Sequence, residues 1–410
     1  MRRRWPGRTG IGKGQHIMKT QTSAEALIHW LLDETPQSLT IFGQEAGFNE
    51  RADLVRAADG TDLNEFWNEV QRTIQIRNQA RNTILDQLTY RVTGVSSEVT
   101  LPSEVDFEEA SEFGQPVGIK ATANRFFRGY DFKFYDLAIR YTWMFLAEAT
   151  VADLRLNHNL ALEADVKIRF RKVMERLFNP LNSTGFTDKN EPMTVFAAYN
   201  ADGEVPPAFN YITFAGSHNH YVVSGNTAVT SANVDTLATL LTEHGYTLQR
   251  GNRLVLWVNA QEAAIISAFR TTTGAKFDFV PNPALYGGKI WVPDNGRYVG
   301  GPTGVLPGEI GTYGPFHIIQ EGLVPAGYLV AIATGGVDNI TNPIGFREHT
   351  NPDYRGLKII PGQRSQYPLT DSFYRRGFGT GIRQRGSVAV MQVKAAAPYV
   401  IPAAYDAANF

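Results

Sequence analysis

The stretch RGFGTGIRQRGSVAVMQV, residues 376–393, decides the predicted fold. Its last part, 387–393, is an apolar run that predicts a strand. Before it, Gly377, Gly379 and Gly381 give the glycine density of a dinucleotide-binding loop, but the third glycine of that fingerprint is missing and no helix follows. We therefore predict that these glycines permit a close backbone approach or a bulge before the closing strand.

The charge around this stretch is one-sided. Residues 372–394 contain five basic residues and no acidic one, whereas residues 98–112 contain six acidic residues and no basic one. Two solvated faces are the ordinary explanation of such runs. Complementary charged patches also set the register and encounter rate of two partners. The candidate contact residues are Glu98, Glu104, Asp106, Glu108, Glu109, Glu112, Arg375, Arg376, Arg383 and Arg385.

The acidic run lies in a segment with the alternation of a β-hairpin. Residues 90–134 contain several period-2 apolar stretches, and the turn-type sequence SEFGQP at 111–116 divides them. A lone two-stranded hairpin is marginally stable in water and cannot enclose a core of its own. We therefore expect its apolar residues to lie on another surface, in the same subunit or in a neighbour.

Helical periodicity marks several other segments. A capping box at Thr22 and Glu25 opens one predicted helix, and a second helix starts near Asp62, with a continuation through Leu88 left open. The apolar repeat over Val151–Phe178 predicts a rod of about 42 Å. Further helices are predicted at 233–243 and 259–269, and strands at 253–258, 277–280, 289–292, 328–332 and 387–393. Because helices and strands do not strictly alternate, the predicted fold class is α+β.

The composition limits the function. The 410 residues include 19% charged and 11% aromatic residues, no cysteine, and a formal net charge of -1. The absence of cysteine excludes disulfides, thiolate zinc sites and cysteine nucleophiles. The near-neutral charge argues against a protein whose whole surface binds nucleic acid. A low-charge, aromatic-rich chain fits extensive burial against other chains.

The N-terminus is basic, with six Lys and Arg in residues 1–20, but no apolar stretch of a secretory signal follows. No run of about 18 apolar residues predicts a membrane span. We prefer a disordered basic tail to a nucleic-acid arm. The segment 7–14 nearly matches a phosphate-binding P-loop, but Gly14 stands where a hydroxyl must hold magnesium. Because Lys13-Gly14 resembles a translated ribosome-binding site, our hypothesis is that the mature chain begins at Met18 and not at Met1.

No motif nominates a catalytic site, a cofactor site or a metal site. His218 and His220 are a possible metal pair on one face of a strand. However, no carboxylate is near in the sequence, and flanking glycines favour a loop tip. His158, on the apolar stripe of the long helix, is predicted to be a packed core residue. The prediction is therefore a protein that is not an enzyme, although a dispersed triad stays open.

The order of these elements resembles that of the major capsid proteins of tailed bacteriophages with the Hong Kong 97 fold. The resemblance covers about residues 22–395 and rests on layout, with 376–393 as its most characteristic stretch. It implies an N-terminal arm at 1–60, a helical lead-in at 61–89, an extended E-loop hairpin at 90–134, a spine helix and the first part of the peripheral P-domain at 135–225, an axial A-domain at 226–339, and the second part of the P-domain with a C-terminal tail at 340–410.

The resemblance also implies a function and partners. Such a protein self-assembles as hexamers and pentamers into the icosahedral shell of a virion, which encloses double-stranded DNA without sequence-specific binding. Assembly is expected in the host cytoplasm, with a separate scaffolding protein, a portal and decoration proteins as partners, and without a membrane or a cofactor. In this family the E-loop crosses the P-domain of a neighbour, which would bring the acidic and basic runs together.

Some members of the family also join subunits by an isopeptide bond between Lys and Asn that a Glu promotes, although most do not. The residues that could have these roles are Lys120, Asn342, Asn351 and Glu348. Two alternative functions remain at this stage: an encapsulin-type nanocompartment shell, which shares the fold but encloses proteins, and a β-rich hydrolase with a dispersed site. The greater length and the prominent hairpin favour the phage shell over the nanocompartment.

Overall fold

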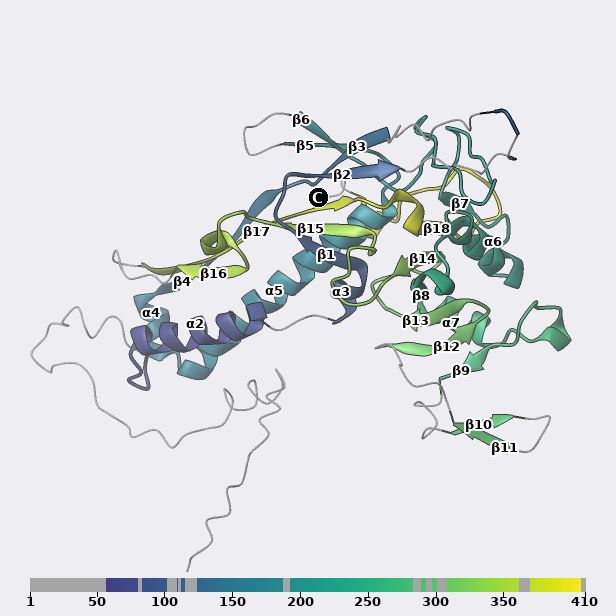
Figure 1. The fold of residues 1–410 in the computed structure, drawn as a ribbon. Coiled ribbons are helices and arrows are strands. Elements are labelled where there is room, and N and C mark those ends of the chain that lie inside the picture. The colour runs from purple at the N-terminus through teal and green to yellow at the C-terminus, as the bar shows by residue number, and fades with distance from the viewer. Residues whose placement is uncertain are drawn as a thin grey trace, which may run out of the picture.

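The computed structural model describes residues 57–79, 83–101, 109, 112–114, 124–186, 192–282, 289–292, 297–300, 308–360 and 369–406 (Figure 1). The predicted helix that opens at Thr22 lies outside these residues, as do Glu104, Asp106, Glu108 and Lys120. In the described part of the chain, no helix combines the length and the apolar character that a membrane span needs. The described part combines helices with largely antiparallel sheets, and its helices and strands do not strictly alternate, which confirms the α+β class.

The α-helices of the described residues include a long central one. They are α2 (Leu63–Gln79), α3 (Thr83–Leu88), α4 (Trp143–Glu148), α5 (Val151–Phe178), α6 (Ser231–Thr242) and α7 (Ala260–Ser267). Helix α5 has the predicted bounds, and a capping box fixes its start: the carboxylate of Asp153 accepts hydrogen bonds from the backbone N–H and the hydroxyl of Thr150 at 2.9 and 2.8 Å. Helices α2 and α3 lie on either side of residues 80–82, which are outside the described residues, so the predicted continuation through Leu88 stays a prediction.

A five-stranded sheet lies along α5 (Figure 1). Its strands follow the order β1 (Thr89–Val92), β15 (Ile344–Glu348), β17 (Leu369–Ile382) and β16 (Leu357–Ile360), with β4 (Lys133–Thr142) also paired to β17. Only the pair of β1 and β15 is parallel among these described strands. Strand β17 is the hub of the sheet, because β4, β15 and β16 all pair with it.

The glycines of β17 confirm the predicted close backbone approach. A Cβ atom on Gly379 would lie 1.4 Å from the carbonyl oxygen of Asp131, and one on Gly381 would lie 2.4 Å from that of Gly129. Real Cβ atoms do not approach other atoms this closely, so a side chain at either position would force the backbone of residues 129–131 away from the sheet.

A seven-stranded sheet lies beyond the C-terminal end of α5 (Figure 1). Its central strands are almost wholly apolar and buried, as expected for strands covered on both faces. The strand order is β7 (Tyr221–Val223), β18 (Val388–Gln392), β14 (Tyr328–Thr334), β8 (Arg253–Val258), β13 (Phe316–Gln320), β12 (Glu309–Tyr313) and β9 (Val280–Pro281). Strand β18 therefore pairs with β14 and not with β17. Both β17 and β18 lie in the segment 340–410, which the resemblance assigned to the second part of the P-domain.

Two layers of helices enclose the seven-stranded sheet. The C-terminal part of α5 packs one face, where Phe170 and Leu177 join Trp257 in a buried cluster. Helices α6 and α7 cover the opposite face through residues such as Leu237 and Ile266. The N-terminal part of α5 packs instead against α2 and the five-stranded sheet. The long helix thus connects both sheets, as its predicted role of a spine requires.

Small ribbons complete the described fold. Strands β2 (Ser96–Leu101) and β3 (Asn124–Gly129) form an antiparallel ribbon at the base of the predicted E-loop hairpin. Two other antiparallel ribbons are β5 (Ser183–Phe186) with β6 (Pro192–Val195), and β10 (Lys289–Val292) with β11 (Arg297–Gly300). The 3₁₀ turns are η2 (Leu248–Arg250), η3 (Thr271–Thr273), η5 (Pro352–Tyr354), η6 (Arg385–Ser387) and η7 (Ala403–Tyr405).

Candidate functional site

Three acidic residues of the predicted hairpin are described: Glu98, on the ribbon of β2 and β3, and Glu109 and Glu112, in the segment between these strands. Glu98 is exposed on β2, opposite Phe127 of β3, whose side chain is 63% exposed. Glu109 and Glu112 are exposed as well, next to the fully solvated Phe113. The ribbon and its extension thus combine carboxylates with uncovered aromatic rings, a composition suited to contact with another surface.

The base of this ribbon is held by buried polar contacts. The guanidinium group of Arg128, on β3, forms an ion pair with Glu204 and packs against the rings of Phe126 and Phe196. Beside it, the Tyr130 hydroxyl donates a hydrogen bond to Ser97 at 2.7 Å. These contacts hold the ribbon against the rest of the subunit.

The basic run on β17 divides between two faces of the strand. Phe373 and Arg375 point outward, whereas Tyr374 and Arg376 point into the core, as the period-2 geometry of a strand demands. Nη1 of Arg376 lies 3.0 Å from both carboxylate oxygens of the buried Asp165, on α5. The structure therefore corrects the prediction for Arg376: its charge is used inside the subunit.

Arg385 is also corrected by the structure. Its side chain is buried and donates hydrogen bonds to the carbonyl groups of Ala197 and Ala198, at 2.9 and 3.1 Å. It also forms ion pairs with Asp202 and Glu204, each at 2.8 Å. Burial raises the pKa of Asp202, but hydrogen bonds from Arg385 and Asn182 lower it, and the net shift is downward. Arg385 therefore has no side-chain group left for a neighbour.

Two of the predicted basic residues stay at the surface. The guanidinium group of Arg375 packs over the rings of Tyr354 and Phe134, at 5.0 and 6.0 Å from their centroids, and Asp136 is its cross-strand neighbour on β4. Arg383 is half-buried and lines a hollow near the base of β2. Arg375 is the candidate that offers a charged group on the outer face of the five-stranded sheet.

The structure describes three of the predicted cross-link residues: Asn342, Asn351 and Glu348. Asn342 is fully buried: its amide donates to the carbonyl groups of Asp86, Thr89 and Gly336, and its oxygen accepts from the Thr334 hydroxyl. This corrects the prediction for Asn342, because a buried amide with all its hydrogen bonds made is not available to a neighbouring lysine.

Asn351, Glu348 and Lys120 complete that set. The side chain of the exposed Asn351 caps the turn η5, where it accepts a hydrogen bond from the backbone N–H of Asp353 at 2.9 Å. Glu348 is half-buried at the end of β15, where it pairs with Phe378. Lys120 lies outside the described residues, so its role in a cross-link stays a prediction.

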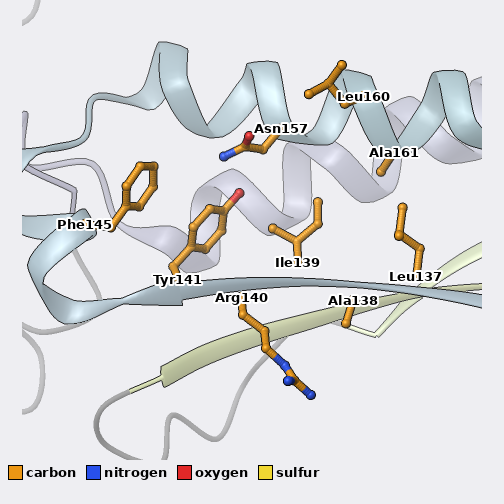
Figure 2. A pocket seen from close by; sticks show the side chains of 9 residues that line it. All are labelled: Leu137, Ala138, Ile139, Arg140, Tyr141, Phe145, Asn157, Leu160 and Ala161. Carbon is orange, nitrogen blue, oxygen red and sulfur yellow. The ribbon is translucent and has the colours of Figure 1, made fainter.

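An apolar groove that the sequence did not single out runs between β4 and α5. Figure 2 shows Leu137, Ile139 and Tyr141 pointing from β4 toward α5, which lies above them with Leu160. The groove has a volume of about 400 Å³ and is lined mainly by apolar side chains, together with Arg140 and Asn157. Two of the apolar side chains are exposed: Leu137 is 43% exposed and Leu160 is 55% exposed. Burial raises the pKa of Tyr141 to about 12, so its phenol is neutral. The groove presents apolar surface to a partner.

Strand β4 lies at the edge of the described sheet, beside this groove. Among the described strands, β4 pairs only with β17. Met144 and Leu156 extend the exposed apolar surface along α4 and α5. An exposed strand edge next to apolar side chains is a ready site for pairing with another chain.

His158 lies in the core behind this groove, as predicted. Its Nδ1 atom is hydrogen-bonded to the hydroxyl of Tyr374, and its ring contacts Phe66 and Trp67. Burial lowers the pKa of His158 to about 4, so the imidazole is neutral at pH 7. The residue joins α5 to β17 and to α2 and has no role at the surface.

A second polar cluster joins His218, His220, Glu243 and His244. The three Nε2 atoms lie 2.9, 2.9 and 3.0 Å from one another, and an oxygen of Glu243 lies 3.4 Å from Nε2 of His218. The sequence preferred a loop tip for His218 and His220. It missed His244 and Glu243 because they follow α6 and become neighbours only through the fold.

Burial is the main influence on the titration of this cluster. It lowers the pKa of His218, and together with neighbouring positive groups it lowers the pKa of His220 to about 3 and that of His244 to about 2. It also raises the pKa of Glu243. The three imidazoles are therefore neutral at pH 7.

Comparison with known proteins identifies the family. A structure from Mycobacterium phage Patience is similar to this chain at 39% sequence identity, with a TM-score of 0.67, and the match covers 90% of this chain and 99% of that one. A GTA particle capsid matches at 12% identity and a TM-score of 0.44, covering 77% and 91% of the two chains. An encapsulin complex from Synechococcus elongatus matches at 12% identity and a TM-score of 0.39, covering 80% and 97%.

No family model and no curated protein sequence matches the chain. The identity and coverage of the match to the phage structure, together with the fold, show that the chain belongs to the major capsid proteins of tailed bacteriophages with the Hong Kong 97 fold. It is a structural shell protein of the virion. The predicted family and function are thereby confirmed, and the encapsulin-type compartment is the lesser alternative.

Proposed function

We propose that copies of this chain associate as hexamers and pentamers in an icosahedral shell around double-stranded DNA, and that the groove between β4 and α5 is where a neighbouring copy binds. The observation that carries the proposal is the exposed apolar side chains of the groove, next to β4, which pairs only with β17 among the described strands. Contiguous apolar surface of this kind is rare on monomeric proteins and marks interaction sites. The chain would act as a structural protein and not as an enzyme.

Charge complementarity favours a second copy as the occupant. Arg375 lies on the outer face of the same sheet, and the exposed Glu98, Glu109 and Glu112 lie on the ribbon or in the segment between its two strands. Opposite patches on one chain can meet when the ribbon of one subunit crosses the sheet of the next, and such contacts govern encounter and register more than affinity. Many modest contacts then stabilise a closed shell through multivalency.

A variant of the groove tests this proposal. We expect Leu160→Lys to keep the far-UV circular dichroism of the parent, because the side chain is largely exposed in the subunit, but to prevent shell assembly. Leu181→Lys is the matched control, since Leu181 is 63% exposed outside the groove. Sedimentation and negative-stain microscopy measure the particles. Normal shells from Leu160→Lys would contradict the role of the groove.

Charge reversal at Arg375 and at Arg376 tests whether the two faces of β17 have different roles. Arg375→Glu should slow assembly and make it less dependent on salt while the subunit stays folded, because rim charges act on encounter rates. Arg376→Glu should destabilise the subunit itself, because it places a second carboxylate beside the buried Asp165. Light scattering during assembly and urea unfolding of the two subunits distinguish these effects. Equal assembly rates for Arg375→Glu and the parent would count against an intersubunit role of this charge.

The content of the particles tests the role of the shell. A phage head formed in infected cells contains double-stranded DNA, whereas an encapsulin-type compartment contains protein. We propose that scaffolding, portal and decoration proteins are separate partners and that assembly takes place in the host cytoplasm. Particles that form from this chain alone with a uniform size would remove the need for a scaffolding protein.

A further inference from the structure

The polar cluster of His218, His220, Glu243 and His244 has the composition of a metal site. His218 and His220 lie just before β7, and Glu243 and His244 follow the last residue of α6. One ligand atom from each residue can be chosen so that all four lie within 4.8 Å of one another. Two segments that are separate in the sequence thus direct three imidazole nitrogens and one carboxylate to a single point.

Hydrogen bonds alone do not account for this arrangement. The three Nε2 atoms form a nearly equilateral triangle with sides of 2.9, 2.9 and 3.0 Å. A neutral imidazole nitrogen carries either a hydrogen or a lone pair. Among three mutually close nitrogens, at least two are therefore of the same kind, so at least one side of the triangle sets two lone pairs or two hydrogens against each other. A cation at the centre removes this conflict because all three nitrogens can direct lone pairs at it.

The surroundings prepare these side chains for a cation. Nδ1 of His220 is hydrogen-bonded to the carbonyl oxygen of Val388. Since a carbonyl can only accept, Nδ1 carries the hydrogen and Nε2 carries the lone pair. Histidines that bind metals usually have such a carbonyl or carboxylate partner on the other nitrogen.

Aromatic packing fixes the third ligand. The ring of His244 stacks on Phe214, with centroids 4.4 Å apart, and on Tyr199, with centroids 5.4 Å apart. The backbone of Gly386 closes another side, since a Cβ atom there would lie 2.9 Å from Cγ of His244. The ring therefore has little freedom to turn away from the cluster.

The carboxylate supplies a fourth position. An oxygen of Glu243 lies 3.4 Å from Nε2 of His218, and among the described residues this oxygen is buried without a hydrogen-bond donor. Glu243 also stands at the C-terminal end of α6, where the helix dipole favours a positive charge. The Glu243 oxygen and the C-terminal end of α6 thus both favour a positive charge at this point. Among the described residues, no cationic group donates a hydrogen bond to that oxygen.

We propose that His218, His220, His244 and Glu243 bind a zinc ion. Three imidazoles and one carboxylate are ligands typical of zinc, which prefers four of them in a tetrahedral arrangement. Metal–nitrogen distances of about 2.0–2.1 Å place tetrahedral ligand atoms about 3.3–3.4 Å apart. The distance from Glu243 to His218 already has this value, and the imidazoles need to separate by only a few tenths of an ångström.

The ion would connect three parts of the subunit. His218 and His220 belong to the segment that also carries Asp202 and Glu204, His244 belongs to the end of α6, and His220 is tied to β18 through Val388. In a chain without cysteine, a metal ion with these ligands is a means of cross-linking segments that disulfides do not provide. The proposal does not depend on the contact role of the groove.

Zinc binding to the purified, untagged full-length chain tests the proposal. The chain is stripped with a chelator, dialysed and titrated with zinc sulfate, and bound zinc is measured by elemental mass spectrometry. We expect one zinc per chain and a higher melting temperature in its presence. Cobalt(II) in place of zinc should give the visible absorption of a tetrahedral site, and this readout needs only the parent chain.

Variants then assign the ligands. His218→Ala and His244→Ala should weaken zinc binding more than about 100-fold, beyond the 10–100-fold effect usual for residues that only support a ligand. His317→Ala is the matched control, because His317 pairs with Glu309 at 2.8 Å but belongs to no group of three or more ligating residues in the described part of the chain, and it should bind zinc as the parent does. A parent chain without stoichiometric zinc or a tetrahedral cobalt spectrum overturns the proposal, as do cluster variants that bind like the parent.

Discussion

Replacement of Arg385 by methionine should destabilise the subunit strongly. The side chain is only 2% exposed, and its guanidinium group donates hydrogen bonds to five acceptors: Ala197 O at 2.9 Å, Ala198 O at 3.1 Å, Asn200 Oδ1 at 2.9 Å, Asp202 Oδ1 at 3.2 Å and Glu204 Oε2 at 2.8 Å. Methionine fills similar space but donates no hydrogen bond. The substitution therefore leaves the carboxylates of Asp202 and Glu204 with Arg128 as the remaining cation of the cluster.

The expected change in the free energy of unfolding follows from the acceptor groups that lose Arg385 as their donor. Removal of one member of a buried ion pair costs about 3–5 kcal/mol, and each buried neutral acceptor that loses its donor costs about 1–3 kcal/mol. Asp202 and Glu204 retain side-chain exposures of 18% and 10%, and Asp202 keeps a hydrogen bond from Asn182, so water and remaining donors offset part of the loss. We expect a decrease of about 3–5 kcal/mol in the free energy of unfolding.

Equilibrium urea unfolding of the unassembled full-length subunit measures this decrease. The fluorescence of the buried Trp257 reports on the seven-stranded sheet, and the slope with urea should not change. Arg385→Lys keeps the charge but not the planar fork, so it should lie between Arg385→Met and the parent. The control Arg253→Met, at an exposed position, should remain within about 0.5 kcal/mol. A change below about 1 kcal/mol for Arg385→Met would refute the reasoning.

Three other substitutions have distinct expected results. Asn342→Asp sets a carboxylate against three carbonyl oxygens and should lower the free energy of unfolding by about 2–4 kcal/mol in urea titrations, whereas a change within error would mean that this amide is not structural. Gly379→Ala should give insoluble or strongly destabilised chain in expression and melting assays, because Cβ would overlap the carbonyl oxygen of Asp131; normal melting would contradict this. The depressed pKa of His158 in the folded state means that the unfolded state binds more protons between about pH 6.5 and pH 4, so the parent loses up to about 3 kcal/mol of stability as the pH falls through this window. In urea titrations at pH 7 and pH 4.5, His158→Gln should show a smaller loss than the parent, and an equal loss in both chains would refute the assignment.

Local patterns in the sequence predicted the elements well where one apolar face repeats. The bounds of α5 agree with the prediction at both ends, because the repeat over Val151–Phe178 is long and a capping residue and a proline flank it. Strand β8 also agrees, since Arg253–Val258 is an unbroken apolar run after one polar residue. By contrast, β18 could not be assigned to its sheet, because pairing with β14 depends on residues about 60 positions away.

The candidate site was predictable as a region but not residue by residue. A run of arginines does not say which side chains point inward, and the partner of Arg376 is 211 residues away in the sequence. The groove between β4 and α5 has no sequence signature, because Leu137 and Leu160 look like ordinary core residues until the fold leaves them uncovered. His244 likewise meets His218 only across the turn from α6. Tertiary contacts therefore decide which of these residues act inside the subunit and which act at its surface, a distinction that the sequence alone does not make.

The segment from Ala197 to His220 explains why the subunit can present a long ribbon without relying on a neighbour for its base. At one end Glu204 holds Arg128 of β3 and Arg385 of η6 together, and at the other end His220 is bonded to Val388. These contacts are buried and internal, so their loss acts on the stability of the subunit. By contrast, Glu98 and Phe127 of the ribbon are exposed, as are Leu137 and Leu160 of the groove. Changes at the base should therefore alter folding, and changes at the ribbon surface and the groove should alter assembly.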